Sequence, residues 1–131
     1  MAKITEELKA MIKGQQAFVA TATPDGIPSV APKVTTRVLD DEHIIFSESA
    51  GKRTFDNIKM NPKVAIVIGD VSNMQCLRFS GTAEIITTGP LYEESTETMK
   101  KMGMPAPQAV IKVKVEEIYD CGAPGFGKRI D

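Results

Sequence analysis

Hydrophobic and polar residues alternate along much of this chain, and a period of two is typical of β-strands. In the segment 109–119, branched apolar residues would face inward, and two lysines and a glutamate would face outward. The segment 75–87 alternates in the same way, but Gly81 stands at one of its inward positions. A glycine there predicts a β-bulge or a tight bend, as at the corner of a barrel.

The segment 63–70, KVAIVIGD, differs because both sets of alternating positions are apolar. This pattern predicts a strand that is buried on both faces. One face carries Val64 and its alternate neighbours, and the other carries Ala65, Val67 and Gly69. One face would fill the core, so the other must be covered by a helix or by a second subunit.

The N-terminal half predicts three more strands. Residues 17–23 are rich in strand-forming side chains and end at a Pro-Asp-Gly turn. Residues 27–39 alternate from Pro32 onward, so one continuous strand is expected there. Its two prolines lack the N–H group that a sheet ladder needs, which makes the strand irregular or places it at an edge. A short acidic turn then leads into a strand at 44–48.

Three helices are expected between these strands. The first would begin after Thr5 as N-cap and run through Lys13, so that residues 1–14 form an N-terminal helix. The second spans 50–61 and is closed by Pro62, and the third begins at Pro90 and reaches Met102. The tail 120–131 shows no period and would be either flexible or a cover for a cofactor.

Six strands joined mostly by tight turns favour an antiparallel barrel or sandwich. A length of 131 residues, with 42% hydrophobic and 25% charged residues, predicts one globular domain over 1–131. The net charge of −1 gives no support for nucleic-acid or membrane binding. Cys76, Cys121 and the single histidine, His43, are too few for a disulfide framework or a metal site. The N-terminus has no signal-peptide pattern, so a cytoplasmic location is expected.

One stretch suggests a binding site. Lys52 and Arg53 stand at the expected start of the second helix, where the helix dipole makes cations unfavourable. The stretch is not a P-loop, because Phe46 replaces the required glycine and Arg53 separates Lys52 from Thr54. Two alternatives remain: free N–H groups, Thr54 and the two cations hold a phosphate, or this is a solvated basic turn with Thr54 as N-cap.

The order of these segments resembles the pyridoxamine 5'-phosphate oxidase-like, FMN-binding split-barrel superfamily, over roughly Gln15 to Glu117. The motifs that carry the resemblance are GKRTFDNIKMNPKVAIVIGD and FSGTAEI. The resemblance implies a mainly β fold, a six-stranded antiparallel split β-barrel of Greek-key type with short peripheral helices. It also implies a homodimer with two FMN molecules at the subunit interface, which would cover the outer face of 63–70.

The resemblance further implies which residues contact FMN. The helix start would hold the phosphate, the segments 32–35 and 47–49 would follow the flavin ring, and residues 75–76 would approach it. The implied cofactor-binding residues are Pro32, Lys33, Val34, Thr35, Ser47, Glu48, Ser49, Lys52, Arg53, Thr54, Gln75 and Cys76. Lys33 would stabilise negative charge on the reduced ring, and N–H groups near Glu48 would serve the ring atom N5. We nominate no side chain as a catalytic acid or base and no metal ligand.

The chain departs from the family pattern in its tail and in its aromatic residues. The tail lacks the histidine of the family's substrate-gripping segment, so pyridoxamine phosphate oxidase activity is not expected. There is no tryptophan to lie against the flavin, and Phe126 is the candidate substitute. The tail either frays or reaches over the partner's flavin, with Lys128 or Arg129 near a substrate anion. Simpler alternatives are that Cys76 is a small core residue and that Lys33 is solvated on an edge strand.

The sequence therefore predicts an FMN-binding flavoprotein that transfers electrons or reduces a small substrate, with a small-molecule or protein redox partner. Two alternatives stay open at this point. One is a non-catalytic flavin-binding or storage module, and the other is a deazaflavin-dependent reductase on the same barrel.

Overall fold

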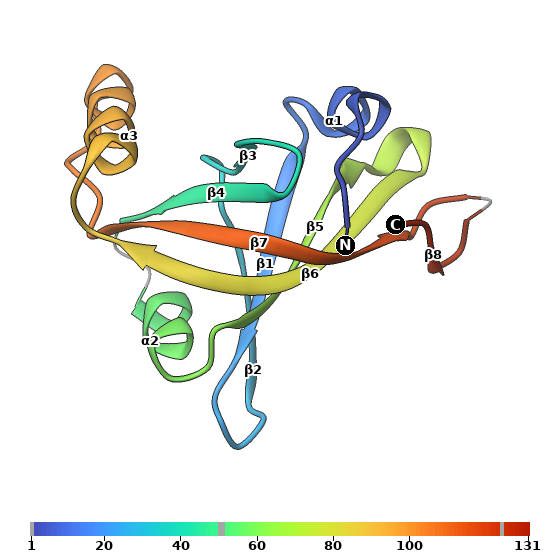
Figure 1. Cartoon of the computed structure of the whole chain (residues 1–131), viewed down its shortest axis with the longest axis horizontal. Coiled ribbons are helices and arrows are strands. Elements are labelled where there is room, and N and C mark those ends of the chain that lie inside the picture. The colour runs from blue at the N-terminus through green and yellow to red at the C-terminus, as the bar shows by residue number, and fades with distance from the viewer. Residues whose placement is uncertain (1, 50–51, 124) are drawn as a thin grey trace.

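The computed structural model describes residues 2–49, 52–123 and 125–131, which form a strongly curled antiparallel sheet with three helices around it (Figure 1). Along the sheet the strands follow the order β2-β1-β5-β6-β7-β4-β3, and β8 pairs with β7. The elements are α1 (Glu6–Ile12), β1 (Gln16–Ala22), β2 (Pro28–Pro32), β3 (Arg37–Val38), β4 (His43–Glu48), α2 (Lys52–Met60), β5 (Lys63–Asp70), the 3₁₀ turn η1 (Val71–Asn73), β6 (Gln75–Ile86), α3 (Pro90–Lys101), β7 (Ala109–Asp120) and β8 (Lys128–Arg129).

The antiparallel split-barrel class fits the prediction, but the described residues form eight strands rather than six. The expected single strand at 27–39 is two strands, because a turn interrupts it. The N–H and hydroxyl groups of Thr36 donate to the Lys33 carbonyl at 3.1 and 2.6 Å and close this turn. Val34 is 72% exposed on the turn instead of facing inward. The expectation of an irregular or edge strand is confirmed, since β2 and β3 lie at the two edges of the sheet.

The core lies inside the curl of the sheet, where the inward positions of five strands meet. Val19, Phe46, Ile66, Phe79 and Ile118 are all fully buried there. Helices α1 and α2 contribute one buried isoleucine each to the same cluster, so they pack on the inner side of the sheet. Helix α3 lies outside this cluster, beyond the ends of β6 and β7 (Figure 1).

The bulge expected at Gly81 is present. The register between β6 and β7 shifts at Ser80 and Gly81, and Glu116 is the extra residue on β7. A side chain at Gly81 would overlap the backbone carbonyl of Lys114. Glycine is therefore required by the close approach of the two strands, and the bend helps the long strands curl around the core.

The prediction that β5 is buried on both faces holds for one face of the described chain. Val64, Ile66 and Ile68 are buried in the core, whereas Ala65 and Val67 on the outer face are only half-buried. The reason is that the helices contacting β5 and its neighbours pack on the inner side. An apolar strip of the outer sheet face is thus open in the single chain.

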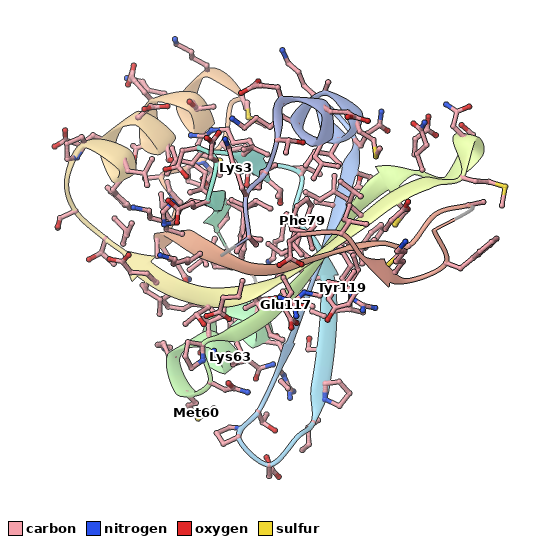
Figure 2. All side chains as sticks on the ribbon, turned by 45° about the vertical axis from the view of Figure 1, so that its right-hand side comes forward. Lys3, Met60, Lys63, Phe79, Glu117 and Tyr119 are labelled. Carbon is pink, nitrogen blue, oxygen red and sulfur yellow. The ribbon has the colours of Figure 1, made fainter. Side chains whose placement is uncertain are left out.

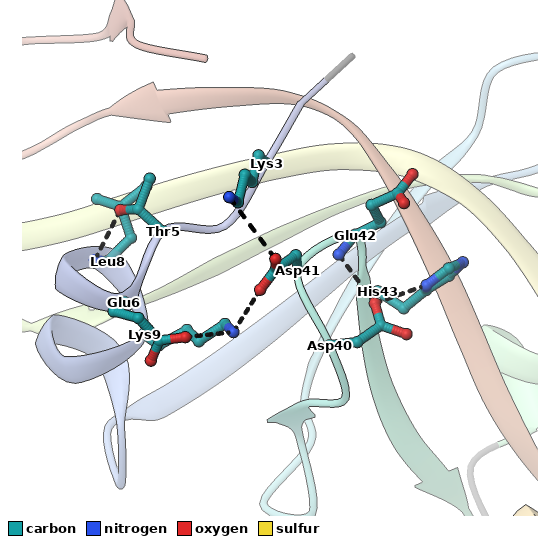
Figure 3. Close-up of polar contacts among 9 residues, drawn as sticks. All are labelled: Lys3, Thr5, Glu6, Leu8, Lys9, Asp40, Asp41, Glu42 and His43. Atoms are coloured by element: carbon teal, nitrogen blue, oxygen red, sulfur yellow. Dashed lines mark hydrogen bonds and ion pairs between the residues drawn. The ribbon is translucent and has the colours of Figure 1, made fainter.

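Polar contacts tie the N-terminal segment to the turn before β4 (Figure 3). Thr5 caps α1 by accepting from the Leu8 N–H, as expected. The side chain of Asp41 accepts from Lys9 at 2.6 Å, which, together with the charge of Lys9, holds the pKa of this carboxyl below its usual range. His43 lies 2.8 Å from an Asp40 carboxylate oxygen in the same turn, so its ring serves local structure.

The described residues of the tail lie against β7. Strand β8 pairs with the end of β7, and the Ile130 N–H donates to the Ile118 carbonyl at 2.8 Å. The Arg129 guanidinium bonds Glu117 at 3.0 Å, and Glu117 in turn accepts from the neighbouring Tyr119 hydroxyl (Figure 2).

Among the described residues, none of the helices has the length and apolar character needed to cross a membrane.

Candidate functional site

The strands β2 and β4 end at one groove of about 160 Å³. Its walls come mainly from two segments of the chain, the start of the turn after β2 and the end of β4, and one residue after α3 adds to them. The lining residues are Pro32, Lys33, Val34, Thr35, Ser47, Glu48, Ser49 and Met104. Seven of these are residues that the family resemblance implied, and Met104 is the one that sequence reasoning missed. Met104 follows α3 in a segment without periodicity, so the sequence carries no signal for it.

Hydrogen bonds fix the turn on both sides of the split in the barrel. The Lys33 N–H donates to the Ala17 carbonyl on β1 at 3.1 Å. The Thr35 hydroxyl accepts from the Ser47 N–H on β4 at 2.9 Å. The Glu48 carbonyl, next along β4, accepts from the Gln108 N–H at 2.8 Å. Both walls of the groove are thus held by hydrogen bonds within the protein, two between backbone groups and one to the Thr35 hydroxyl.

A nearly buried ion pair lies in the wall of the groove. The Lys33 ammonium is 3.0 Å from one Glu48 carboxylate oxygen, and their side chains are 11% and 0% exposed. The alternative that Lys33 is solvated on an edge strand is therefore wrong. The second Glu48 oxygen, Oε2, is buried and has no hydrogen-bond partner within the described part of the chain. Burial of a carboxylate with one unbonded oxygen costs free energy of desolvation. The contact with Lys33 therefore provides much of the compensation for this cost.

Helix α2 begins directly after this groove. Lys52 and Arg53 are exposed in its first turn, and no ion-pair partner for either is found in residues 2–49, 52–123 and 125–131. Thr54 is 3% exposed and is the third residue of the helix, so the alternative that it is the N-cap is wrong. The expected helix start at residue 50 lies outside the described residues. Three residue steps separate Ser49 from Lys52, so their Cα atoms lie within about 10 Å.

Gln75 and Cys76 are not part of this groove. They line a second pocket of about 260 Å³ at the opposite end of the sheet, where β6 begins (Figure 1). Cys121 and Phe126 line the same pocket, and Phe126 is 78% exposed. Cys76 is half-buried on the outer sheet face, so the alternative of a core residue is wrong. Within one chain, the residues around Lys33 and Glu48 therefore lie close to the start of α2. Gln75, Cys76 and Phe126 lie at the other end of the sheet.

A third and larger pocket was not expected from the sequence. It has a volume of about 330 Å³ and lies between α1 and β3, with Ile12, Val38 and Ile68 among its apolar walls. Three cations line it: Lys9 and Arg37 pair with acidic side chains, and Lys13 has no ion-pair partner in the described part of the chain. The pocket lacks any residue of the implied cofactor set.

Comparison with known proteins identifies the family. Residues 4–122 match the family model described as pyridoxamine 5'-phosphate oxidase. The chain belongs to this pyridoxamine 5'-phosphate oxidase-like family. Among curated proteins it is similar to the uncharacterized protein MJ0282 of Methanocaldococcus jannaschii, with 33% identity over 98% of this chain and 88% of the relative.

Two solved structures are also similar in sequence and fold. HupZ of Group A Streptococcus is 35% identical, with a TM-score of 0.88 over 98% of this chain and 99% of that chain. A Lactobacillus delbrueckii protein that bears the family name is 30% identical, with a TM-score of 0.77 over 91% of this chain and 95% of that one. More distant structures share the fold alone, and they include an FMN-binding protein of Syntrophomonas wolfei, an F420 reductase and a heme storage protein of Vibrio cholerae.

Proposed function

We propose that this protein is an FMN-binding flavoprotein that transfers electrons or reduces a small substrate, with FMN bound at the interface of a homodimer. The observation that carries the proposal is the groove at residues 32–35 and 47–49, followed within a few residues by the basic start of α2. The groove offers a wall for a flat ring, and for a phosphate the helix start offers N–H groups and two cations that have no ion-pair partner among the described residues. Bound flavin would supply hydride or electron transfer, and the protein would supply orientation and charge.

The ion pair in the groove gives the ring a defined electrostatic environment. Lys33 is held in place by Glu48 at 3.0 Å, so its ammonium charge is positioned before a ligand binds. In this proposal the Lys33 ammonium would stabilise negative charge on the reduced ring. The negative charge of the Glu48 carboxylate partly offsets the positive charge of Lys33, and this would limit how strongly Lys33 stabilises the reduced ring. The backbone N–H groups near Glu48 would orient the ring.

The exposed apolar surface on the outer face of the sheet is the argument for a second copy of the chain as partner. Phe18 on β1 pairs with Pro32 on β2 and with Val67 on β5, so these apolar side chains form one continuous surface. Phe18 is 44% exposed and Val30, on the same face, is 67% exposed. A twofold interface would bury this strip and would bring the second pocket of one subunit near the groove of the other. Light scattering at micromolar concentration should give twice the chain mass, and a single-chain mass would contradict the dimer.

The helix start provides the direct test of FMN binding. We expect Lys52→Ala/Arg53→Ala to weaken FMN binding by about 3–6 kcal/mol, since each charge-assisted hydrogen bond contributes roughly 1.5–3 kcal/mol. The dissociation constant would then rise by about two to four orders of magnitude. Riboflavin lacks the phosphate, so it should bind the unaltered protein weakly and be nearly insensitive to the double substitution. The measurement is a set of fluorescence titrations of FMN and riboflavin.

Lys100→Ala/Lys101→Ala is a matched control, because it removes the same charge from exposed positions at the end of α3. This variant should keep the affinity for FMN. If the Lys52→Ala/Arg53→Ala protein retains its full preference for FMN over riboflavin, the phosphate is held elsewhere. If the unaltered protein binds neither flavin, the proposed function itself is wrong.

Two further experiments separate the alternatives on this fold. Mass spectrometry of the cofactor extracted from native protein distinguishes FMN from a deazaflavin. Reduction of the bound flavin followed by mixing with acceptors distinguishes an electron-transfer protein from a storage module. A flavin that no acceptor reoxidises would favour storage.

A further inference from the structure

The start of β6 and the end of β7 bring the two cysteines of the chain opposite each other. The register pairs Leu77 with Asp120, so the next row of the ladder pairs Cys76 with Cys121. The Cys121 N–H donates to the Cys76 carbonyl at 2.8 Å, which continues the ladder through this row. Side chains opposite each other on antiparallel strands project from the same face. Both cysteines accordingly line the pocket at this end of the sheet.

The spacing of such a row suits a disulfide. Directly opposed residues on antiparallel strands have Cα atoms about 4.5–5.5 Å apart. A disulfide requires a Cα separation of about 4.4–6.8 Å. Both cysteines are free thiols in this structure. Oxidation would therefore join two side chains that the sheet already holds at a suitable distance.

The residues around the pair keep the two strand ends close and leave the thiols room. Gly69 pairs with Cys76 from the other side, so β5 places no side chain beside the Cys76 thiol. Gly122 lies against Met74 so closely that a side chain there would overlap the Met74 carbonyl. The Ala123 N–H donates to the same carbonyl at 3.0 Å.

In the single chain the pair is accessible from solvent. Both cysteines are partly exposed, and the pocket that they line has a volume of about 260 Å³. Burial raises the pKa of the Cys76 thiol, and Cys121 and Asp120 raise it further. Because the thiolate is the reacting form, exchange at Cys76 should accelerate as the pH rises.

We propose that Cys76 and Cys121 form a redox-active dithiol that low-molecular-weight disulfides, such as glutathione disulfide, oxidise to an intramolecular cross-strand disulfide. One protein thiolate attacks the small disulfide and releases one small thiol, which leaves a mixed disulfide on the protein. The second protein thiolate then attacks the protein sulfur of that mixed disulfide and releases the second small thiol. Two protein thiols are oxidised, one small disulfide is reduced to two thiols, and no other oxidant is needed. The exchange steps themselves do not use the cofactor.

The test is a redox titration of the full chain in glutathione buffers, followed by acid quenching, alkylation and mass spectrometry under denaturing conditions. We expect both thiols to disappear together, with a mass lower by two hydrogen atoms, no glutathione adduct and a bridged peptide joining Cys76 to Cys121. Cys76→Ser and Cys121→Ser should each keep a glutathione adduct on the remaining cysteine, because the second exchange step is blocked.

Several outcomes would overturn the proposal. They are two alkylatable thiols at every glutathione ratio, a lasting glutathione adduct on the unaltered chain, or a disulfide between chains. If a serine variant fails to fold, the titration of the unaltered chain still decides, because joint loss of both thiols without an adduct, at the mass of a single chain, requires an internal bridge.

Discussion

The ion pair between Lys33 and Glu48 makes a quantitative prediction about stability. Lys33→Met keeps the length and much of the apolar volume of the side chain but removes the ammonium group that lies 3.0 Å from the carboxylate. Glu48 is 0% exposed and its other oxygen has no partner in the described chain, so the substitution leaves a buried carboxylate without compensation. Removal of one partner from a buried pair costs about 3–5 kcal/mol.

This loss is large compared with the total stability of a domain, which is about 5–15 kcal/mol. With a urea dependence of about 1–3 kcal/mol per molar, the midpoint of unfolding should fall by roughly 2 M. Lys33→Met/Glu48→Leu removes both charges and should recover most of the stability, because well-packed apolar residues can replace a buried ion pair with little cost.

Urea titrations of the apo protein at pH 7 provide the measurement. The matched control is Lys63→Met, which breaks an exposed pair with Glu116 at 3.4 Å and should cost less than about 1 kcal/mol. If Lys33→Met is no more costly than Lys63→Met, the carboxylate finds other compensation and the argument for a preformed pair fails. A double variant that is no more stable than Lys33→Met would refute it equally.

Two further predictions concern the bulge and the tail. Gly81→Ala should destabilise the protein by more than about 2 kcal/mol, because the new methyl group would overlap the Lys114 carbonyl. Urea titrations provide the measurement, and a loss of stability near zero would mean that the strands can separate at the bulge. Asp131 accepts hydrogen bonds from Arg129 and from the Ile118 N–H, which lower its pKa from 3.8 to about 2. Because the pKa of Asp131 is lower in the folded state, its ionised carboxylate stabilises the fold at pH values above its pKa in the unfolded chain. This contribution is lost as the pH falls from about 4 to about 2. Asp131→Asn should therefore flatten the pH dependence of stability in that range, and an unchanged dependence would show that the pair does not form in solution.

The sequence predicted much of the fold because the local signals are strong there. The alternation in 109–119, the Thr5 cap and the glycine at the bulge each have one physical cause that acts over a few residues. Local signals also cover most of the groove, because its residues 32–35 and 47–49 each form one continuous segment of the chain. The assignment of these residues to a cofactor came from the family resemblance and not from the pattern itself.

What could not be predicted depends on contacts between distant segments. The alternation of 27–39 continues through Thr36, so the pattern gave no sign that the chain turns at Lys33. Strand β8 has only two residues and pairs through backbone groups, which leaves no period in its sequence. The opposition of Cys76 and Cys121 follows from the register of two long strands, and one residue of slip would place the thiols on opposite faces.

The turn at Lys33 also explains why the groove lies where the barrel is split. The two edges of the sheet, β2 and β3, are consecutive in the chain and are separated by four residues. These four residues must cross from one edge to the other, and they do so with Lys33 bonded to β1 and Thr35 bonded to β4. The crossing prevents the edges from closing into a continuous ladder and leaves a recess beside the end of β4. The ion pair of Lys33 with Glu48 spans this recess, so the contact that stabilises the crossing also sets the charge in the groove.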